Sequence, residues 1–244
     1  MINLKNKKIL VLGATGSVGK STAIKLSQLG AKVVIQGRNK TKLEQIYSQL
    51  SGEGHYSIEF DISNLDKLDE LINLSVNFDN EKLTGLVYCI GIMPIRPMKS
   101  TKSDFLHETM VINYYAFVEM VRLYSDKRVS DGGSIVAISS YSSINGDKGQ
   151  LAYAASKSAI DSSVIVMSKE LYSKNIRVNA IRPAIVRGEE TNIDLLPTSI
   201  KVTVDRMKIG LIDPNILAEQ IAFLISDYSS GVYGRCFDVK GYLS

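Results

Sequence analysis

The chain of 244 residues is 45% hydrophobic and 22% charged, and its formal net charge is +4. This length and composition predict one globular domain of α/β type. No stretch combines dense Lys and Arg with interleaved aromatic residues, so the sequence gives no indication of a nucleic-acid partner.

The length of the apolar runs and the spacing of the cysteines indicate the cellular location of the protein and whether it binds a metal. No apolar run approaches the ~18 residues of a membrane span, and the basic start MINLKNKK is followed by too few apolar residues for a secretory signal. Cys89 and Cys236 lie far apart in strand-like stretches, which indicates two reduced thiols rather than a disulfide. His55 and His107 have no metal-ligand spacing with them. We therefore expect a cytoplasmic protein that binds neither a membrane nor a metal.

Apolar, β-rich runs alternate along the chain with segments of helical periodicity. The expected strands are residues 8–12, 32–36, 56–60, 84–90, 133–139, 176–182 and 235–239. The expected helices are residues 17–29, 40–50, 64–74, 102–127, 151–173 and 214–226. Helix-length connections imply parallel strands, so the sequence predicts a doubly wound sheet of about seven strands with helices on both faces. Ligands of such a sheet bind beyond the carboxyl ends of its strands.

Residues 184–212 depart from this alternation of strands and helices. The segment is polar, contains Pro197 and shows no clear periodicity. A connection of this length without regular structure is more often functional than structural, so we expect it to form a lid over the substrate.

The first turn, GATGSVGKST at residues 13–22, fits two nucleotide-binding patterns. With Lys20 and Ser21 it matches a permissive P-loop. Three glycines of the same stretch have the spacing of a dinucleotide-binding turn: Gly13, Gly16 and Gly19. Both patterns place helix amides against phosphate, but a P-loop enzyme also needs a strand that ends in an acidic residue for magnesium. The endings VYCIG and VAISS lack one and IEFD offers only Asp61, which favours the dinucleotide and leaves a P-loop NTPase as an alternative.

Further along the chain, SSYSSINGDKGQLAYAASK places Ser140 13 residues before Tyr153 and Lys157 four residues after it. Asn113 and the segments GATGSVG, FDIS, CIG, IRVNAIRPA and YGRCFDVKG extend the pattern over nearly the whole chain. In this combination the sequence resembles the short-chain dehydrogenases/reductases, among them the 3-oxoacyl-acyl-carrier-protein and carbonyl reductases. The resemblance implies a single NAD(P)-binding Rossmann domain over residues 1–244 and an oxidoreductase that interconverts a carbonyl and a secondary alcohol.

The Tyr and Lys of this segment are one helical turn apart and therefore share a face of the helix. A free phenol has a pKa near ~10, and proton transfer is most efficient when the pKa lies near the working pH. One cation at ~4 Å in an effective dielectric of ~20 stabilises an anion by about 4 kcal/mol. We therefore expect Lys157 to lower the pKa of Tyr153 by roughly 3 units.

The resemblance implies a role for each of four polar residues. Tyr153 is the implied general acid and base that gives its proton to the substrate oxygen, and Ser140 the hydroxyl that holds this oxygen. Lys157 is implied to hold the nicotinamide ribose, and Asn113 to support a water that links Lys157 to solvent. Only the spacing selects Ser140 over the other hydroxyls of the segment, which are Ser139, Ser142 and Ser143.

The second expected strand ends in VVIQGRN, where a dehydrogenase that prefers NAD usually carries an acidic residue for the ribose hydroxyls. Here Gly37 occupies that place and Arg38 follows, and a guanidinium suits a 2′-phosphate, so NADP(H) is favoured over NAD. Asp61 and Ile62 are similar to the residues that bracket the adenine, and Gly91 to a turn glycine that admits the ribose. The expected cofactor-binding residues are Gly13, Thr15, Gly16, Ser17, Val18, Gly19, Arg38, Asp61, Ile62, Gly91, Tyr153, Lys157, Pro183, Ile185 and Val186.

Several positions depart from the family pattern. The middle glycine of the first turn is Gly16, whereas the commonest form has it at Ser17. This spacing is similar to that of longer members that act on nucleotide sugars, so an epimerase or dehydratase stays an alternative. Tyr88, Gly188 and Lys240 replace a short amide, a Thr and an Asp. These departures remove no reacting group but leave the substrate open.

The substrate pocket is expected to involve residues 93–98, residues 141–151 and the lid, and to take a small carbonyl or alcohol. Reduction of a 3-oxoacyl thioester is one hypothesis, which rests on the resemblance. The rival is a protein that binds NADP as a sensor or scaffold without turnover, although such a protein would be expected to lack some of the catalytic residues. Apolar faces in VINYYAFVEMV and SAIDSSVIVM predict a homodimer or homotetramer.

Overall fold

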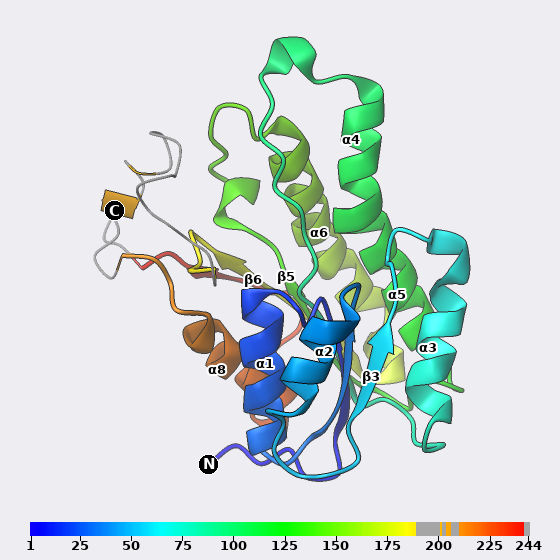
Figure 1. Ribbon diagram of the computed structural model, residues 1–244. Helices are drawn as coiled ribbons and strands as arrows, with labels where there is room; N and C mark the ends of the chain where they lie inside the picture. Colours follow the sequence, from blue (N-terminus) through cyan, green and yellow to red (C-terminus); the bar gives the residue numbers. More distant parts are fainter. Residues whose placement is uncertain (189–200, 202–203, 206–209, 242–244) are drawn as a thin grey trace.

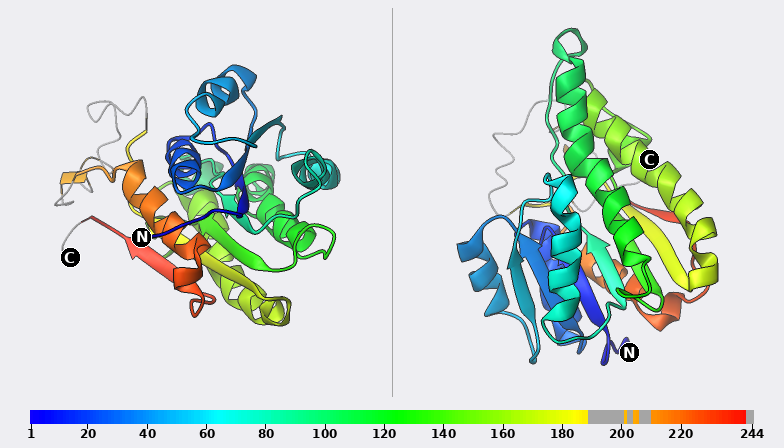
Figure 2. Two further views of the ribbon diagram at one scale, coloured as in Figure 1. Left: turned by 90° about the horizontal axis from the view of Figure 1, so that it is seen from below. Right: turned by 90° about the vertical axis from the view of Figure 1, so that its right-hand side faces the viewer.

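The computed structural model describes residues 1–188, 201, 204–205 and 210–241, and its centre is a seven-stranded sheet (Figure 1). The strands lie in the order β3-β2-β1-β4-β5-β6-β7. Every neighbouring pair is parallel. Helices cover both faces of the sheet (Figure 2). The doubly wound α/β fold expected from the sequence is therefore confirmed.

Each expected strand is present close to its predicted bounds. The strands are β1 (Lys8–Leu12), β2 (Lys32–Gly37), β3 (Tyr56–Glu59), β4 (Gly85–Tyr88), β5 (Gly133–Ile138), β6 (Ile176–Pro183) and β7 (Cys236–Val239). All of β1 is buried, with Ile9 and Val11 in the core on one face and Leu10 and Leu12 in the core on the other. Both faces are covered by helices, which explains why the strands are continuous apolar runs.

Two groups of helices supply the rest of these cores. One face is covered by α1 (Ser17–Gln28), α2 (Lys40–Tyr47) and α8 (Pro214–Ile225). The other face is covered by α3 (Leu68–Asn77), α5 (Ala116–Tyr124) and α6 (Leu151–Glu170), and α4 (Ser103–Met110) extends beyond the ends of the strands. Within the described ranges, no helix is long and apolar enough to cross a membrane.

The helix expected over residues 102–127 is present, but a π-helical turn interrupts its regular α-helical bonding. The helix α4 ends at Met110, a π-helical turn spans Val111–Tyr115, and α5 begins at Ala116. In a π-helical turn the backbone bonds shift from i,i+4 to i,i+5 spacing, and such turns are frequent at functional sites. Asn113 lies within this turn.

Only the two ends of the expected lid and a few residues between them are described. The ends run side by side, because Val186 and Ile212 form a parallel bridge and the Ile212 N–H donates to the Ile185 carbonyl at 2.9 Å. Val204 and Leu211 pack against Ile185. Residues 189–200, 202–203 and 206–209 of the expected lid lie outside the described residues.

Candidate functional site

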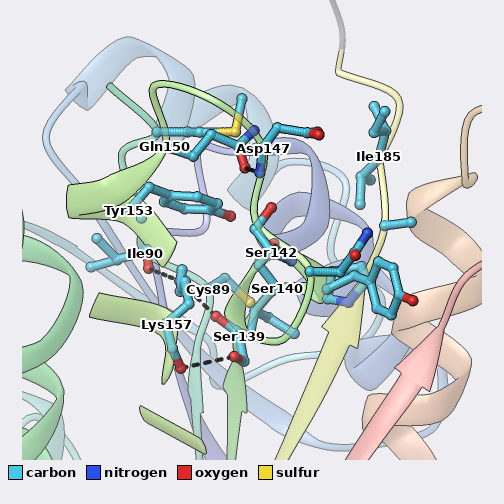
Figure 3. Close-up of a pocket in the computed structure, with 18 residues that line it drawn as sticks. Cys89, Ile90, Ser139, Ser140, Ser142, Asp147, Gln150, Tyr153, Lys157 and Ile185 are labelled. Atoms are coloured by element: carbon cyan, nitrogen blue, oxygen red, sulfur yellow. Dashed lines mark hydrogen bonds between the residues drawn. The ribbon is translucent and has the colours of Figure 1, made fainter. Parts of the chain in front are cut away.

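The candidate site lies where the loops leave the carboxyl ends of the central strands, which is the usual position in a doubly wound sheet. Two adjoining cavities open there, with volumes of about 390 Å³ and 240 Å³. Both are lined by Cys89, Ile90 and Gly91, which follow β4. Figure 3 shows the larger cavity and the side chains around it.

Three of the four expected catalytic residues line the larger cavity, namely Ser140, Tyr153 and Lys157. Ser140 follows β5 and begins the short 3-10 turn Tyr141–Ser143, whereas the other two lie one turn apart on α6. The Tyr153 ring reaches into the cavity with Lys157 below it (Figure 3). The ammonium nitrogen of Lys157 is 5.9 Å from the centroid of the Tyr153 ring. The fold therefore brings the three residues together as the sequence spacing suggested.

Lys157 is buried and is held by backbone carbonyls. Its Nζ donates to the Ile138 carbonyl at 2.7 Å and to the Ile90 carbonyl at 3.5 Å. Burial lowers the pKa of Lys157 from 10.5 to about 8, so the amine is protonated in most molecules at neutral pH. A Cβ on Gly91 would lie 3.0 Å from Nζ. The glycine thus leaves room for the ammonium as well as for a ligand.

The pKa of Tyr153 moves in the direction opposite to the expectation. Burial of the phenol raises the pKa above its ordinary value of 10.0, and a hydrogen bond with Ser140 opposes this rise only in part. The Lys157 ammonium is directed at two backbone carbonyls rather than at the phenol oxygen. The expected lowering of the Tyr153 pKa by Lys157 is therefore wrong for this structure, and the phenol keeps its proton at neutral pH.

The contacts of the neighbouring serines distinguish Ser140 from two of its competitors. The Ser139 hydroxyl donates to a backbone carbonyl of α6 at 3.2 Å, and the Ser143 hydroxyl donates to the Asp161 carboxylate at 2.5 Å. The Ser140 oxygen accepts from the backbone N–H two residues further on at 3.1 Å, and its hydroxyl lies beside Tyr153 and acts to lower the pKa of the phenol. Ser140 is thus a hydroxyl of this segment that faces the phenol in the cavity, as the 13-residue spacing suggested.

Asn113 lies beside the cavities without lining either of them. Its side-chain oxygen accepts from the Ile92 N–H at 2.8 Å, and its Nδ2 donates to the Ile92 carbonyl and to the Ser156 hydroxyl, both at 2.9 Å. The side chain therefore joins the loop after β4 to α6, next to Lys157. The expected water link between Asn113 and Lys157 stays a prediction.

Most of the expected cofactor-binding residues lie on the two cavities. The smaller cavity is lined by Gly13, Thr15, Gly16, Arg38, Asp61, Ile62 and Gly91. The larger is lined by Gly91, Tyr153, Lys157, Pro183, Ile185 and Val186. The remaining three form the first turn of α1 and line neither cavity: Ser17, Val18 and Gly19.

The glycine turn combines two glycines that the fold requires with one that it does not. Gly13 has a φ of +77°, and a Cβ on Gly19 would lie 2.2 Å from the Gly13 carbonyl oxygen, so the fold itself needs both. Gly16 has an ordinary φ of −87°, and a Cβ there would come no closer than 3.5 Å to another atom. The missing side chain at Gly16 therefore serves the cavity rather than the fold. The first turn of α1 has no acidic residue, which suits a phosphate at its N-terminus.

The end of the smaller cavity near β2 and β3 carries both charges expected there. A Cβ on Gly37 would lie 2.6 Å from Cγ2 of Thr15, so a side chain at position 37 would require the threonine to move. Arg38 is exposed and lines the cavity. The Asp61 carboxylate accepts from the Ser63 N–H at 3.0 Å and from its hydroxyl at 2.8 Å. The Ser63 N–H is the main cause that keeps the pKa of Asp61 low.

Sequence reasoning missed Gln36, which shapes the same cavity. This buried glutamine accepts from the Gly13 N–H at 3.0 Å and donates to the Phe60 carbonyl at 2.6 Å. It thereby ties the turn after β1 to the end of β3. The signal was a single amide in the otherwise apolar stretch VVIQG.

Two departures from the family pattern also have a structural place. Tyr88 is fully buried, and its hydroxyl donates to the Ile112 carbonyl at 2.6 Å. The Lys240 ammonium lies 4.7 Å from the ring centroid of Tyr141 and 3.8 Å from the Asp238 carboxylate. Neither residue is among the described residues that line the two cavities of the site.

Comparisons with known proteins establish the family. A family model described as enoyl-(acyl carrier protein) reductase matches residues 13–242. The 3-oxoacyl-[acyl-carrier-protein] reductase FabG of Rickettsia felis is 31% identical over 243 residues, which cover 99% of this chain and 98% of that protein. The chain therefore belongs to the short-chain dehydrogenase/reductase family of oxidoreductases, whose members bind a nicotinamide cofactor.

Solved structures of the same family have the same fold. A short-chain dehydrogenase/reductase from Serratia marcescens superposes with a TM-score of 0.91 at 21% identity, covering 99% of both chains. A 7α-hydroxysteroid dehydrogenase, complexed with NADH and 7-oxo glycochenodeoxycholic acid, superposes with a TM-score of 0.90 at 25% identity, covering 98% of this chain and 95% of that one. Membership of this family favours the dinucleotide-binding pattern in residues 13–22 over the P-loop.

Proposed function

We propose that the protein is an NADP(H)-dependent oxidoreductase that interconverts a carbonyl compound and a secondary alcohol. The observation that supports this most directly is the convergence of Ser140, Tyr153 and Lys157 on one cavity that adjoins the glycine-lined cavity. A bound nicotinamide supplies or accepts the hydride in such a reaction, and the residues of the chain handle the proton.

Tyr153 is the proposed proton donor in the reductive direction. Because burial raises its pKa, the phenol carries a proton at neutral pH and has one to give. Its O–H bond breaks as an O–H bond forms at the substrate oxygen, and the Ser140 hydroxyl, which lines the same cavity, orients that oxygen. The negative charge left on Tyr153 is then near the Lys157 ammonium, which favours the transfer.

Lys157 is proposed to hold the ribose of the cofactor. An ammonium has three N–H donors, and the carbonyls of Ile138 and Ile90 accept from it. Its remaining donor capacity is available to a ribose hydroxyl or to a water next to Gly91. The same hydrogen bonds to the backbone fix the position of the ammonium below Tyr153. Lys157 can therefore interact with both the ligand and the phenol.

The preference for NADP(H) rests on the end of β2. A carboxylate at position 37 would accept from the ribose hydroxyls of NAD, but this chain has a glycine packed against Thr15 there. The exposed guanidinium of Arg38 lies on the rim of the same cavity and suits a 2′-phosphate. NAD is the less favoured alternative.

The substrate is proposed to be a small ketone or a 3-oxoacyl thioester whose reacting part is uncharged. The larger cavity, at about 390 Å³, has the size of a small-molecule site. Its described lining combines apolar Met93 and Ile185 with polar Asn145 and Gln150. Among its described lining residues, Lys157 and Asp147 are the charged ones, and the carboxylate disfavours an anionic group beside it. The name of the Rickettsia felis relative supports the thioester as the first compound to test.

Self-association is proposed as well. Large apolar side chains are exposed on α6, where Ile165 is 48% and Val166 51% accessible. Tyr115, at the end of the π-helical turn, is also partly exposed. Apolar helix faces of this kind are typical of contacts between copies of one chain.

The rival hypothesis is an NADP-binding sensor or scaffold without turnover. A spectrophotometric assay of NADPH oxidation distinguishes the two, with 3-oxoacyl thioesters, neutral ketones, diketones and keto acids as substrates. We expect turnover by the wild type, the keto acids being poorest, and a loss of about 100-fold or more in kcat/KM for Tyr153→Phe, since general acid catalysis contributes that much.

The matched control is Tyr141→Phe, which removes a hydroxyl from another tyrosine of the same cavity and is expected to keep most of the activity. All three proteins should still be stabilised by NADPH in a thermal-shift measurement. If NADPH binds but no carbonyl is reduced, and Tyr153→Phe behaves like the wild type, the sensor hypothesis is correct.

A further inference from the structure

A buried tyrosine at the end of β4 contacts the backbone of the π-helical turn. The Tyr88 hydroxyl donates to the Ile112 carbonyl at 2.6 Å, and its ring packs edge-on against Phe117 of α5, with 5.4 Å between the ring centroids. Both rings are fully buried in the core between the sheet and α5. The phenol thus supplies a hydrogen-bond donor from within the core to a backbone carbonyl of the π-helical turn.

The turn that Tyr88 contacts carries the residue that joins two parts of the site. Asn113 follows Ile112 directly, and its side chain binds both backbone groups of Ile92 and the hydroxyl of Ser156. Ile92 belongs to the loop that lines the smaller cavity, and Ser156 precedes Lys157 on α6. A shift of the π-helical turn would therefore reach both the loop after β4 and the residue before Lys157 on α6.

The same loop contacts Lys157 from the other side. The Ile90 carbonyl accepts from the Lys157 ammonium at 3.5 Å, and Gly91 leaves the room that this ammonium occupies. The contacts thus form a closed path. It runs from Tyr88 at the end of β4 to the π-helical turn, and from Asn113 of this turn both to the loop after β4 and to α6. Each step in the path is a hydrogen bond or a peptide bond.

We propose that Tyr88 is a positioning residue, whose hydroxyl holds the π-helical turn so that Asn113 keeps the loop after β4 and Lys157 of α6 in register. This inference rests on the proposed reductase function for its kinetic part only. The position is one where the family pattern has a short amide, and a short side chain at the end of β4 would not reach the core that the Tyr88 ring fills. Tyr88 is therefore a device of this chain rather than of the pattern.

The test is Tyr88→Phe, which keeps the buried ring and removes only the hydroxyl. The matched control is Tyr124→Phe, because Tyr124 is also fully buried in the same core and its hydroxyl donates to the Gly132 carbonyl at 3.0 Å. That bond lies next to the amino end of β5, whereas the site lies beyond the carboxyl ends of the strands. Both variants lose one buried hydroxyl-to-carbonyl bond, so a general loss of stability affects them alike.

We expect kcat to fall about tenfold in Tyr88→Phe and to stay within about twofold in Tyr124→Phe, as the loss of one positioning hydrogen bond predicts. The KM for NADPH should change less than kcat in both. In the protein without ligand, backbone amide exchange should become faster over residues 90–92 and 111–115 in Tyr88→Phe only. If both variants show the same kcat and the same exchange pattern, the Tyr88 hydroxyl is merely structural.

A double-mutant cycle with Asn113→Ala tests the path itself. If Tyr88 acts through Asn113, the tenfold effect of Tyr88→Phe should shrink to less than about twofold when Asn113 is already replaced. Additive effects would overturn the proposed path. If the wild type reduces no carbonyl, the proposed function fails, whereas the exchange comparison in the ligand-free protein still decides the role of Tyr88.

Discussion

The two cavities of the site are built in different ways. The smaller one is formed by backbone and by missing side chains, with Gly13 and Gly19 packed so closely that the fold needs both and Gly16 left open to the cavity. The larger one is formed by buried polar side chains whose atoms are held by backbone groups, as the two carbonyl bonds of Lys157 show. The smaller cavity is thus left open by missing side chains, whereas the polar side chains of the larger one are fixed by contacts with the backbone.

This difference predicts opposite sensitivities to mutation. Adding atoms should damage the glycine-built half, because the space is already occupied or is reserved for the ligand. Truncating the polar side chains of the larger cavity should lower activity. It should not lower stability to the same extent, because burying a charge such as the Lys157 ammonium is itself unfavourable. The buried polar side chains of the larger cavity should therefore lower the free energy of unfolding.

The largest expected effect is a pH dependence of stability, which arises from the burial of the Lys157 ammonium. The pKa of Lys157 is about 8 in the folded chain and 10.5 in the unfolded chain. Between these values the unfolded chain holds a proton that the folded chain has released, so the free energy of unfolding rises with pH. The rise amounts to about 3 kcal/mol over this window, at ~1.4 kcal/mol per unit.

Denaturant unfolding of the wild type and of Lys157→Met, from pH 7.5 to 10.5, measures this rise as the difference between the two proteins. The difference removes the titration of the other groups, which both proteins share. The control is Lys169→Met, which removes an exposed lysine of the same helix and should differ from the wild type by an amount that does not depend on pH. A difference for Lys157→Met that is flat across this pH range would mean that its ammonium is well solvated.

The next effect concerns the glycine-built half. In Gly19→Ala the new Cβ would lie 2.2 Å from the Gly13 carbonyl oxygen, so the turn must open. We expect the free energy of unfolding to fall by about 2 kcal/mol, as in other overpacked sites, and the stabilisation by NADPH to be lost. Thermal unfolding with and without NADPH measures both.

Two further glycines provide the controls. A Cβ on Gly231 meets nothing within 4 Å, so Gly231→Ala should leave stability and NADPH binding unchanged. Gly16→Ala is also expected to keep its stability, because its φ is ordinary, but to bind NADPH about tenfold more weakly. Wild-type NADPH affinity in Gly16→Ala would show that the space beside Gly16 is not used by the cofactor.

The same contrast explains how much the sequence could predict. The joint position of Tyr153 and Lys157 was predictable, because both lie on one helix, where spacing alone sets their common face. The first turn was predictable because Gly13 and Gly19 are required by local geometry. In contrast, Gln36 joins the turn after β1 to the end of β3, and no local pattern reveals a bond between segments so far apart.

For the fold, apolar runs between helical segments were sufficient to place every strand. They were not sufficient to find the π-helical turn, because its residues are as apolar and as helix-compatible as their neighbours. The raised pKa of Tyr153 was equally hidden, since it depends on burial and on where the Lys157 ammonium points. What escaped sequence reasoning was therefore set by tertiary contacts.

The smallest expected effect concerns the choice of cofactor on the exposed rim. NADPH differs from NADH by its 2′-phosphate, so the ratio of the two dissociation constants isolates the contacts of that group. We expect Arg38→Ala to weaken NADPH binding about tenfold, the value of a charge-assisted hydrogen bond, and to leave NADH binding unchanged. Titration calorimetry with both cofactors measures the ratio.

Arg38→Lys keeps the charge but not the bidentate geometry, so it should fall between the wild type and Arg38→Ala. Lys40→Ala removes a neighbouring exposed cation and should leave the ratio unchanged. An equal loss of both cofactors in Arg38→Ala would mean that Arg38 contacts a group that NADH also has. Because Arg38 is exposed, its removal should not alter the thermal stability of the ligand-free protein, in contrast to Gly19→Ala. In the smaller cavity, the preference for one cofactor would then be independent of stability. In the larger cavity, Lys157 is expected to affect both activity and stability.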